Sequence, residues 1–183
     1  MPTIDTARLR LRPFSPDDAP AYHTAILSDP DVMRYLPGRE PLPVEQTAAN
    51  LDRIREHWEQ RNYGLWAVIH RANDRLIGHC GLHMLPEGTA VEVVYALARA
   101  YWGQGLAAEA AHASLRYGFE TLGLDRIIAV AVPANTASLR VMEKIGMAYQ
   151  GIIPAYGTEL PCYALARAGF QPGDALYVLR DEA

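Results

Sequence analysis

The segment that most limits the fold of this chain lies between residues 91 and 111. There an apolar strand pattern passes through a short glycine-rich turn into an alanine-rich helix pattern. Residues Val91–Leu97 are mostly β-branched, aromatic or aliphatic, as a buried or half-buried strand requires. From Leu106 to Leu115 the chain carries Ala and Leu at helical spacing. We therefore predict that Gly103-Gln104-Gly105 forms the turn at the N-terminus of a helix.

A glycine turn in this position favours an anionic ligand. The first N–H groups of a helix have no intrahelical partner and the helix dipole is positive there, so a phosphate or pyrophosphate binds well. Glycine lets the backbone approach such a ligand, although glycines between a strand and a helix can also form only a tight turn. Two common nucleotide motifs are excluded. The third glycine of a Rossmann loop is Ala108 here, and the Gly-Lys-Ser/Thr of a P-loop is absent.

Three segments match, in the right order, the motifs of one enzyme superfamily. They are Thr6–Phe14 (TARLRLRPF), Tyr101–Ala110 (YWGQGLAAEA) and Asn135–Met147 (NTASLRVMEKIGM). The chain therefore resembles the GNAT superfamily of acyltransferases, in particular its branch of Rim-type ribosomal-protein N-terminal acetyltransferases. In that superfamily the glycine turn binds the pyrophosphate of acetyl-CoA. The resemblance covers most of residues 6–168.

The resemblance implies an α/β (α+β) GNAT fold. Its single mixed, mostly antiparallel central sheet has six to seven strands, is splayed at its middle and is flanked by about four helices. We expect residues 1–183 to form one domain, with residues 169–183 as a C-terminal extension. The residue patterns predict strands near 9–14, 65–69, 76–84, 91–97, 127–132, 149–153 and 162–167, and helices near 15–27, 44–61, 106–115 and 135–146.

Composition limits the partners and the compartment. The net charge of −4, with acidic and basic residues interspersed, provides no broad basic field, so we expect no direct contact with nucleic acid. No apolar run is long enough for a membrane span and no secretory signal is evident. Cys80 and Cys162 lie in apolar stretches and are predicted to be buried free thiols, which suits the cytoplasm. The six histidines lack metal-ligand spacing, so we predict no metal.

Glu92 is the candidate catalytic base. It is the one carboxylate within the predicted strand 91–97, and it lies where many GNAT enzymes carry a glutamate that deprotonates the amine, directly or through water. Beside Val94 and close to a cleft, its pKa could rise toward neutrality. The alternative is a solvent-facing glutamate paired with a charge on a neighbouring strand.

Asn135 and Ser138 have the spacing of a helix N-cap and its N3 residue. The resemblance adds a second role, since in the family both positions face the coenzyme and the serine lies near the sulfur. Many members place a tyrosine acid seven residues after this asparagine, but Met142 stands there and cannot donate a proton. Ser138 is therefore the first candidate to assist the departing thiolate, with Tyr156 or water as alternatives.

The resemblance assigns the coenzyme site to backbone groups. It places the pantetheine arm against Leu97 and Ala98, and the pyrophosphate against the glycine loop. The predicted coenzyme-binding residues are Leu97, Ala98, Gly103, Gln104, Gly105, Leu106, Ala107, Asn135 and Ser138. Two positions depart from the motif: Ala100 replaces a Gln or Arg and Ala108 replaces a Thr or Ser, so loop N–H groups must provide most of the binding, helped by Arg99 or Arg140.

We therefore expect an enzyme that transfers the acetyl group of acetyl-CoA to a primary amine by direct attack in a ternary complex. The acceptor is a protein N-terminus or a small-molecule amine. Two rivals remain open, a non-catalytic acyl-CoA-binding or sensing module and a nucleotide-binding regulator. The tail is compatible with an extra strand, a homodimer contact or an ordered flap. Candidates to line an acceptor cleft are Pro37-Gly38-Arg39-Glu40, His57, Trp66, His83, Tyr156 and Tyr163.

Overall fold

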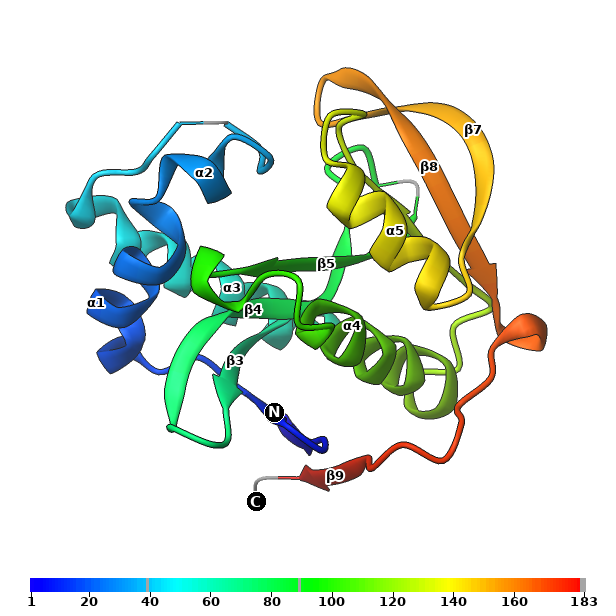
Figure 1. Cartoon of the computed structure of the whole chain (residues 1–183), viewed down its shortest axis with the longest axis horizontal. Coiled ribbons are helices and arrows are strands. Elements are labelled where there is room, and N and C mark those ends of the chain that lie inside the picture. The colour runs from blue at the N-terminus through cyan, green and yellow to red at the C-terminus, as the bar shows by residue number, and fades with distance from the viewer. Residues whose placement is uncertain (39, 89, 182–183) are drawn as a thin grey trace.

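One sheet of nine strands runs through the molecule (Figure 1). A computed structural model of the chain describes residues 1–38, 40–88 and 90–181. The strand order is β7-β8-β6-β5-β4-β3-β2-β1-β9, and every neighbouring pair is antiparallel except β5 and β6. The predicted mixed, mostly antiparallel sheet is therefore confirmed. The predicted number of six to seven strands is too low.

Seven strands correspond to the predicted ones, and two short ones add to them at one side of the sheet. The strands are β1 (Pro2–Asp5), β2 (Leu9–Arg12), β3 (Leu65–His70), β4 (Arg75–Met84), β5 (Val91–Leu97), β6 (Arg126–Val130), β7 (Ala148–Ala155), β8 (Thr158–Ala166) and β9 (Val178–Asp181). The unpredicted strand β1 is buried along its whole length, so it lacks the polar–apolar alternation by which a strand is recognised. It pairs with β9 in the C-terminal extension.

The four predicted helical regions are confirmed, and the short helix at Pro30–Met33 was not predicted. The helices are α1 (Ala19–Tyr22), α2 (Pro30–Met33), α3 (Thr47–Arg61), α4 (Leu106–Arg116) and α5 (Thr136–Lys144), and short 3-10 or π-helical turns extend α1, α3 and α4. The first helical region begins at a capping box between Ser15 and Asp18. Gly146, with φ of 85°, follows the last helix and ends it. None of the helices in the described ranges is long and apolar enough to cross a membrane.

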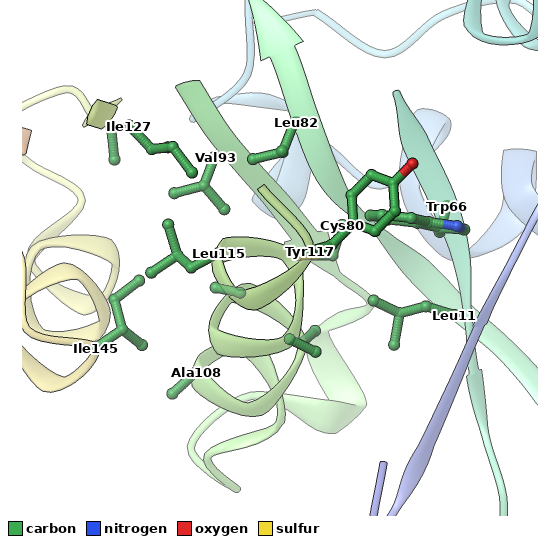
Figure 2. Packing of buried hydrophobic residues seen from close by; sticks show 14 of the residues in the cluster. Leu11, Trp66, Cys80, Leu82, Val93, Ala108, Leu115, Tyr117, Ile127 and Ile145 are labelled. Carbon is green, nitrogen blue, oxygen red and sulfur yellow. The ribbon is translucent and has the colours of Figure 1, made fainter. Parts of the chain in front are cut away.

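The helices form two layers, one on each face of the sheet (Figure 1). α4 and α5 pack on one face, where Leu115 and Ile145 lie in the same apolar cluster as Val93 of β5 (Figure 2). The other face is covered by α1–α3, whose buried side chains form a second cluster with strands β3 and β5. Four of the buried positions of α4 are alanines. Because these side chains are small, the backbone of this helix can lie close to the sheet.

The sheet opens between its two parallel strands. β5 and β6 are in register only at Glu92 and Ile128, near the start of β5. β6 ends at Val130, two residues before the predicted end, and the chain leaves the sheet there. Further along β5 the two strands no longer pair. The predicted splay is thus present, and it places a cleft between the two helical layers.

Candidate active site

A cleft of about 240 Å³ occupies the gap between β5 and β6. One wall is β5 from Glu92 to Tyr95, and the facing wall is the segment 130–132 that follows β6. The N-terminal half of α5 and the β7–β8 turn close two further sides, and the loop 35–38 closes another. Side chains from five parts of the chain therefore meet in this cleft.

Glu92 lies inside the cleft and is 2% exposed. Its pKa is raised to about 7, chiefly by burial and to a smaller extent by the neighbouring charge of Glu87, while a hydrogen bond from Tyr156 opposes the shift. Its cross-strand partner is His83, on the face covered by α1–α3. Glu92 is thus a buried acid that titrates near neutrality, and the solvent-facing alternative is wrong.

Tyr156 reaches Glu92 from the β7–β8 turn. Its hydroxyl donates a hydrogen bond to Oε1 of Glu92. Tyr156 and Gly157 form the two-residue turn, with φ of 54° and 72°, as in a type I′ hairpin. Glycine and asparagine favour such angles, whereas tyrosine is uncommon there, and backbone strain of this kind concentrates at functional sites. The strained turn brings the Tyr156 side chain into the cleft, where its hydrogen bond to Glu92 offsets the cost of the strain.

A second pair of hydroxyls lies on the α5 side of the cleft. The predicted cap is confirmed, because Oδ1 of Asn135 accepts a hydrogen bond from the Ser138 N–H at 3.1 Å. Oγ of Ser138 lies 2.9 Å from the hydroxyl oxygen of Tyr95, which also donates to the Ser138 carbonyl at 3.1 Å. Met142 lines the same cleft. The sequence analysis missed Tyr95, although it is the one hydroxyl-bearing residue of the strand that carries Glu92.

The glycine loop adopts the predicted position before α4. Gly103 and Gly105 have φ of 73° and 75°, and Gly105 is the N-cap of α4 with no side chain capping the helix. The first helical bond joins the Glu109 N–H to the Gly105 carbonyl, so the preceding N–H groups are not used within the helix. Gln104 folds back onto the Ala100 carbonyl, which leaves its backbone as the part available to a ligand.

Two cations that the sequence analysis did not name adjoin this loop. A methyl group on the Cα of Gly105 would lie 3.6 Å from Nζ of Lys144 and 3.7 Å from an Nη of Arg8. Arg8 also donates to the Gln104 carbonyl at 2.9 Å and pairs with Glu109 at 2.7 Å. A second cavity, of about 410 Å³, begins here and extends to residues 172–177.

The other proposed helpers are placed differently. The guanidinium of Arg99 pairs with Asp31 rather than with the loop. Glu109 anchors the N-terminal strand through Thr6 and Arg8, so it supports the fold. Burial alone would raise the pKa of Glu109, but hydrogen bonds from those two residues hold it below its usual value.

The backbone groups proposed for pantetheine already have partners. The Ala98 N–H donates to the Ile77 carbonyl at 2.7 Å, and the Leu97 carbonyl accepts from the indole of Trp102 at 2.6 Å. Neither residue lines the cleft. Binding of pantetheine through Leu97 and Ala98 therefore stays a prediction.

Of the acceptor-cleft candidates, Pro37, Gly38 and Tyr156 line the cleft. The other candidates that the structure describes lie elsewhere. Trp66 is fully buried, His57 and His83 stack on each other with ring centroids 4.5 Å apart, Tyr163 packs on Tyr149, and Glu40 is exposed. Arg39 lies outside the described residues.

The described residues also bear on metal binding and on the reactivity of the two cysteine thiols. Within residues 1–38, 40–88 and 90–181 no cluster of three or more His, Cys, Asp or Glu side chains could hold a metal ion. Cys80 and Cys162 are free and buried, as predicted. Burial raises the pKa of the Cys80 thiol to about 12 and that of Cys162 above its usual value, so both are poor nucleophiles near neutral pH.

The glycine loop, the splayed sheet and the acidic cleft together define an acetyl-group transferase of the GNAT type, and comparison with known proteins agrees. Residues 8–148 match the family described as acetyltransferase (GNAT) domain, so the chain belongs to this family. It is similar to YkkB, an uncharacterized protein of Bacillus subtilis (strain 168), with 34% identity over 165 residues, 86% of this chain and 92% of YkkB.

Solved structures give the same result. A GNAT-family acetyltransferase from Bacillus anthracis superposes with a TM-score of 0.78 at 33% identity, over 91% of this chain and 99% of that one. RimL, a ribosomal L7/L12 alpha-N-protein acetyltransferase in complex with coenzyme A, shares the fold with a TM-score of 0.72. Its identity is 19%, over 88% of this chain and 95% of RimL. The resemblance to the Rim-type branch is thus matched by a shared fold.

Proposed function

We propose that this protein is an acetyl-CoA-dependent N-acetyltransferase that acts on a primary amine by direct attack within a ternary complex. The observation that carries this proposal is the buried carboxylate of Glu92, which lies in the cleft with a pKa of about 7. A general base is most effective when its pKa lies near the working pH. Glu92 meets this condition where the sheet opens.

The reaction begins with an amine that is mostly protonated at neutral pH. Glu92 accepts a proton from the ammonium group, directly or through one water molecule. The neutral nitrogen attacks the thioester carbonyl, whose oxygen is polarised by a backbone N–H of the splayed strand. An N–C bond forms, the C–S bond breaks with its electron pair leaving on the sulfur of coenzyme A, and the nitrogen releases its second excess proton through water to the solvent. Ser138 is placed to donate a hydrogen bond to that sulfur.

The coenzyme is held by backbone and by cations. The free N–H groups at the start of α4 bind the pyrophosphate, and Arg8 and Lys144 provide positive charge within reach of Gly105. Leu97 and Ala98 are the proposed pantetheine contacts. RimL, which has the same fold, is described in complex with coenzyme A, and this supports the same ligand here.

Direct attack is favoured over an acyl-enzyme because of the state of the thiols. Cys80 and Cys162 are buried and have raised pKa values, so neither presents a thiolate to the thioester. The acceptor enters on the side of the loop 35–38 and the Tyr156 turn. We propose an N-terminal α-amine of a protein or a small-molecule amine as the acceptor class.

The test is acetyl-CoA turnover by the full chain against a panel of N-terminal peptides and small amines. Glu92→Gln should lower kcat/KM by about 100-fold or more while the Kd of coenzyme A stays unchanged. Glu159→Gln, on the exposed part of β8, is the matched control and should behave as the wild type. Equal losses in turnover and coenzyme affinity would contradict the role of Glu92 as base.

Two results would favour the rival functions. Calorimetric binding of coenzyme A without turnover across the whole panel would indicate an acyl-CoA-binding or sensing module. Stabilisation by ATP or NAD but not by coenzyme A would indicate a nucleotide-binding regulator.

A further inference from the structure

Tyr95 and Glu92 project from opposite faces of the same strand. They are three positions apart on β5, and side chains along a strand alternate between its faces. Glu92 faces the layer of α1–α3, whereas Tyr95 faces α5 and contacts Ser138 at the N-terminus of that helix. Both residues line the cleft at the splay. The strand therefore carries one polar group to each side of the position where a thioester would lie.

The hydroxyls of Tyr95 and Ser138 can each donate one proton. Three oxygens can accept: the two hydroxyl oxygens and the Ser138 carbonyl. In one arrangement Tyr95 donates to the Ser138 carbonyl at 3.1 Å, and the Ser138 hydroxyl donates to the Tyr95 oxygen at 2.9 Å. In the other, Tyr95 donates to Oγ of Ser138 across the same 2.9 Å, and the serine proton is free to point into the cleft. Rotation about the two C–O bonds interconverts them without transferring a proton.

We propose that Tyr95 is a positioning residue that turns the Ser138 hydroxyl toward the coenzyme sulfur as the C–S bond breaks. This inference rests on the proposed function. The electron pair of the broken bond stays on sulfur, which accepts a hydrogen bond from Oγ–H of Ser138, while Tyr95 transfers its own hydrogen bond from the carbonyl to Oγ. Of the two protons that the ammonium group loses, one goes to Glu92 and the other passes through water to the solvent, so no proton passes between the hydroxyls and the sulfur.

The surroundings suit hydrogen bonding rather than proton transfer. Burial raises the pKa of Tyr95, while its hydrogen bond with Ser138 opposes the shift, so the phenol stays protonated across the neutral range and remains a donor. Ser138 lies in the first turn of α5, where the helix dipole favours negative charge. Met142, one turn further along α5, has only a thioether to offer the cleft.

The first experiment titrates the thiol of bound coenzyme A and needs no amine. The thiolate is followed by its ultraviolet absorbance in complexes of the wild type, Tyr95→Phe, Ser138→Ala and the double variant. Tyr95→Phe and Ser138→Ala should each raise the pKa of the bound thiol by about 1, because Ser138→Ala removes the donor to the thiolate and Tyr95→Phe removes the group that orients this donor. Affinity for desulfo-coenzyme A should stay unchanged in both.

The second experiment is a double-mutant cycle in kcat. Tyr95→Phe and Ser138→Ala should each lower kcat about 10-fold with an unchanged KM for acetyl-CoA, and the double variant should be no slower than Ser138→Ala. Tyr117→Phe is the matched control, since its hydroxyl makes a 3.0 Å bond to the Asn62 carbonyl away from the cleft. This control should retain the wild-type kcat and thiol pKa.

Two results would overturn the role of Tyr95. One is a bound thiol whose pKa is unaffected by Tyr95→Phe, and the other is a multiplicative loss of kcat in the double variant. Failure of the proposed function has a different signature, in which the thiol pKa shifts as expected but no amine on the panel is acetylated.

Discussion

The hydroxyl of Tyr156 donates a hydrogen bond to the carboxylate of Glu92 although the two residues are 64 positions apart in the chain. The pair joins the β7–β8 hairpin to β5 across the cleft where the sheet is open. Because a hydrogen bond from a phenol favours the charged carboxylate, Tyr156 limits how far burial raises the pKa of Glu92. The pKa of Glu92 is therefore set jointly by burial and by Tyr156.

Removal of that hydroxyl should shift the pH dependence of the reaction. A general base must be deprotonated, so kcat/KM should rise with pH through an apparent pKa of about 7 in the wild type. Tyr156→Phe should move this rise toward higher pH by about 0.5 to 1, since the carboxylate loses a donor. Tyr149→Phe, an exposed tyrosine on β7, is the control. An unshifted profile for Tyr156→Phe would show that the hydrogen bond does not tune Glu92.

Glu92 should also lower the stability of the unliganded fold above neutral pH. Its pKa is raised from 4.5 to about 7 on folding. Between these values the folded protein holds a proton that the unfolded chain has released, so the free energy of unfolding falls as pH rises through this window. The full effect is up to about 3 kcal/mol.

The melting temperature of Glu92→Gln should therefore be higher than that of the wild type at pH 8. At pH 4 the two proteins should have the same melting temperature. Thermal unfolding across this pH range measures the difference. A constant gap between the two proteins at all pH values would contradict the link to titration of Glu92. Stability gained at the expense of activity would be the expected compromise at a catalytic site.

Lys144 offers a direct probe of the proposed coenzyme site, because it is the only lysine in the sequence. Coenzyme A bound at the glycine loop should protect Lys144 from an amine-reactive reagent, as measured by mass spectrometry of the modified peptide. Pantetheine, which lacks the phosphates, should protect much less. Undiminished labelling with saturating coenzyme A would place the phosphates away from Lys144.

Neutralising the same residue should weaken binding of acetyl-CoA without lowering kcat. Lys144→Gln should raise the KM for acetyl-CoA several-fold, by roughly 1 kcal/mol for one exposed cation, and added salt should reduce this difference. Arg53→Gln, an exposed cation on α3, is the control. A lowered kcat with an unchanged KM would argue against this assignment.

The C-terminal extension should contribute to stability. Deleting residues 176–183 removes the contact of the Tyr177 ring with Arg116, at 4.5 Å, and the pairing of β9 with β1. We expect a loss of about 2 kcal/mol and a melting temperature lower by roughly 4–8 °C. Arg180→Ala removes one ion pair of Asp5, whose other partner Arg10 remains, and should cost less than about 1 kcal/mol because the Arg180 side chain is exposed. An unchanged melting temperature after the deletion would contradict the structural role.

Most of the sheet could be predicted from the sequence, because the polar–apolar alternation along the strands agreed with the order of the three family motifs. Strand β2 alternates Leu with Arg, and the structure buries its leucines while leaving Arg10 exposed. Strands β1 and β9 could not be found in this way. Each has four residues, and β1 is buried on both faces, so neither provides a periodic signal.

The candidate site could be predicted where chemistry depends on residues close in sequence. The glycine loop and the Asn135 cap are local, so spacing was sufficient. The contacts of Glu92 with Tyr156, of Ser138 with Tyr95, and of the loop with Arg8 all join distant segments. Such contacts follow from the tertiary arrangement of strands, and a single sequence carries no record of it.

The pairing of β1 with β9 has a consequence for how the chain folds. It is the most non-local contact in the sheet, and contacts of this kind form late because a long loop must be closed first. During synthesis β1 has no outer neighbour until residues 178–181 have emerged, so its free edge is open to pairing with other chains. Conditions that slow the completion of translation should therefore promote aggregation, because β1 then stays unpaired for longer. This effect should exceed the aggregation caused by substitutions that destabilise the active site.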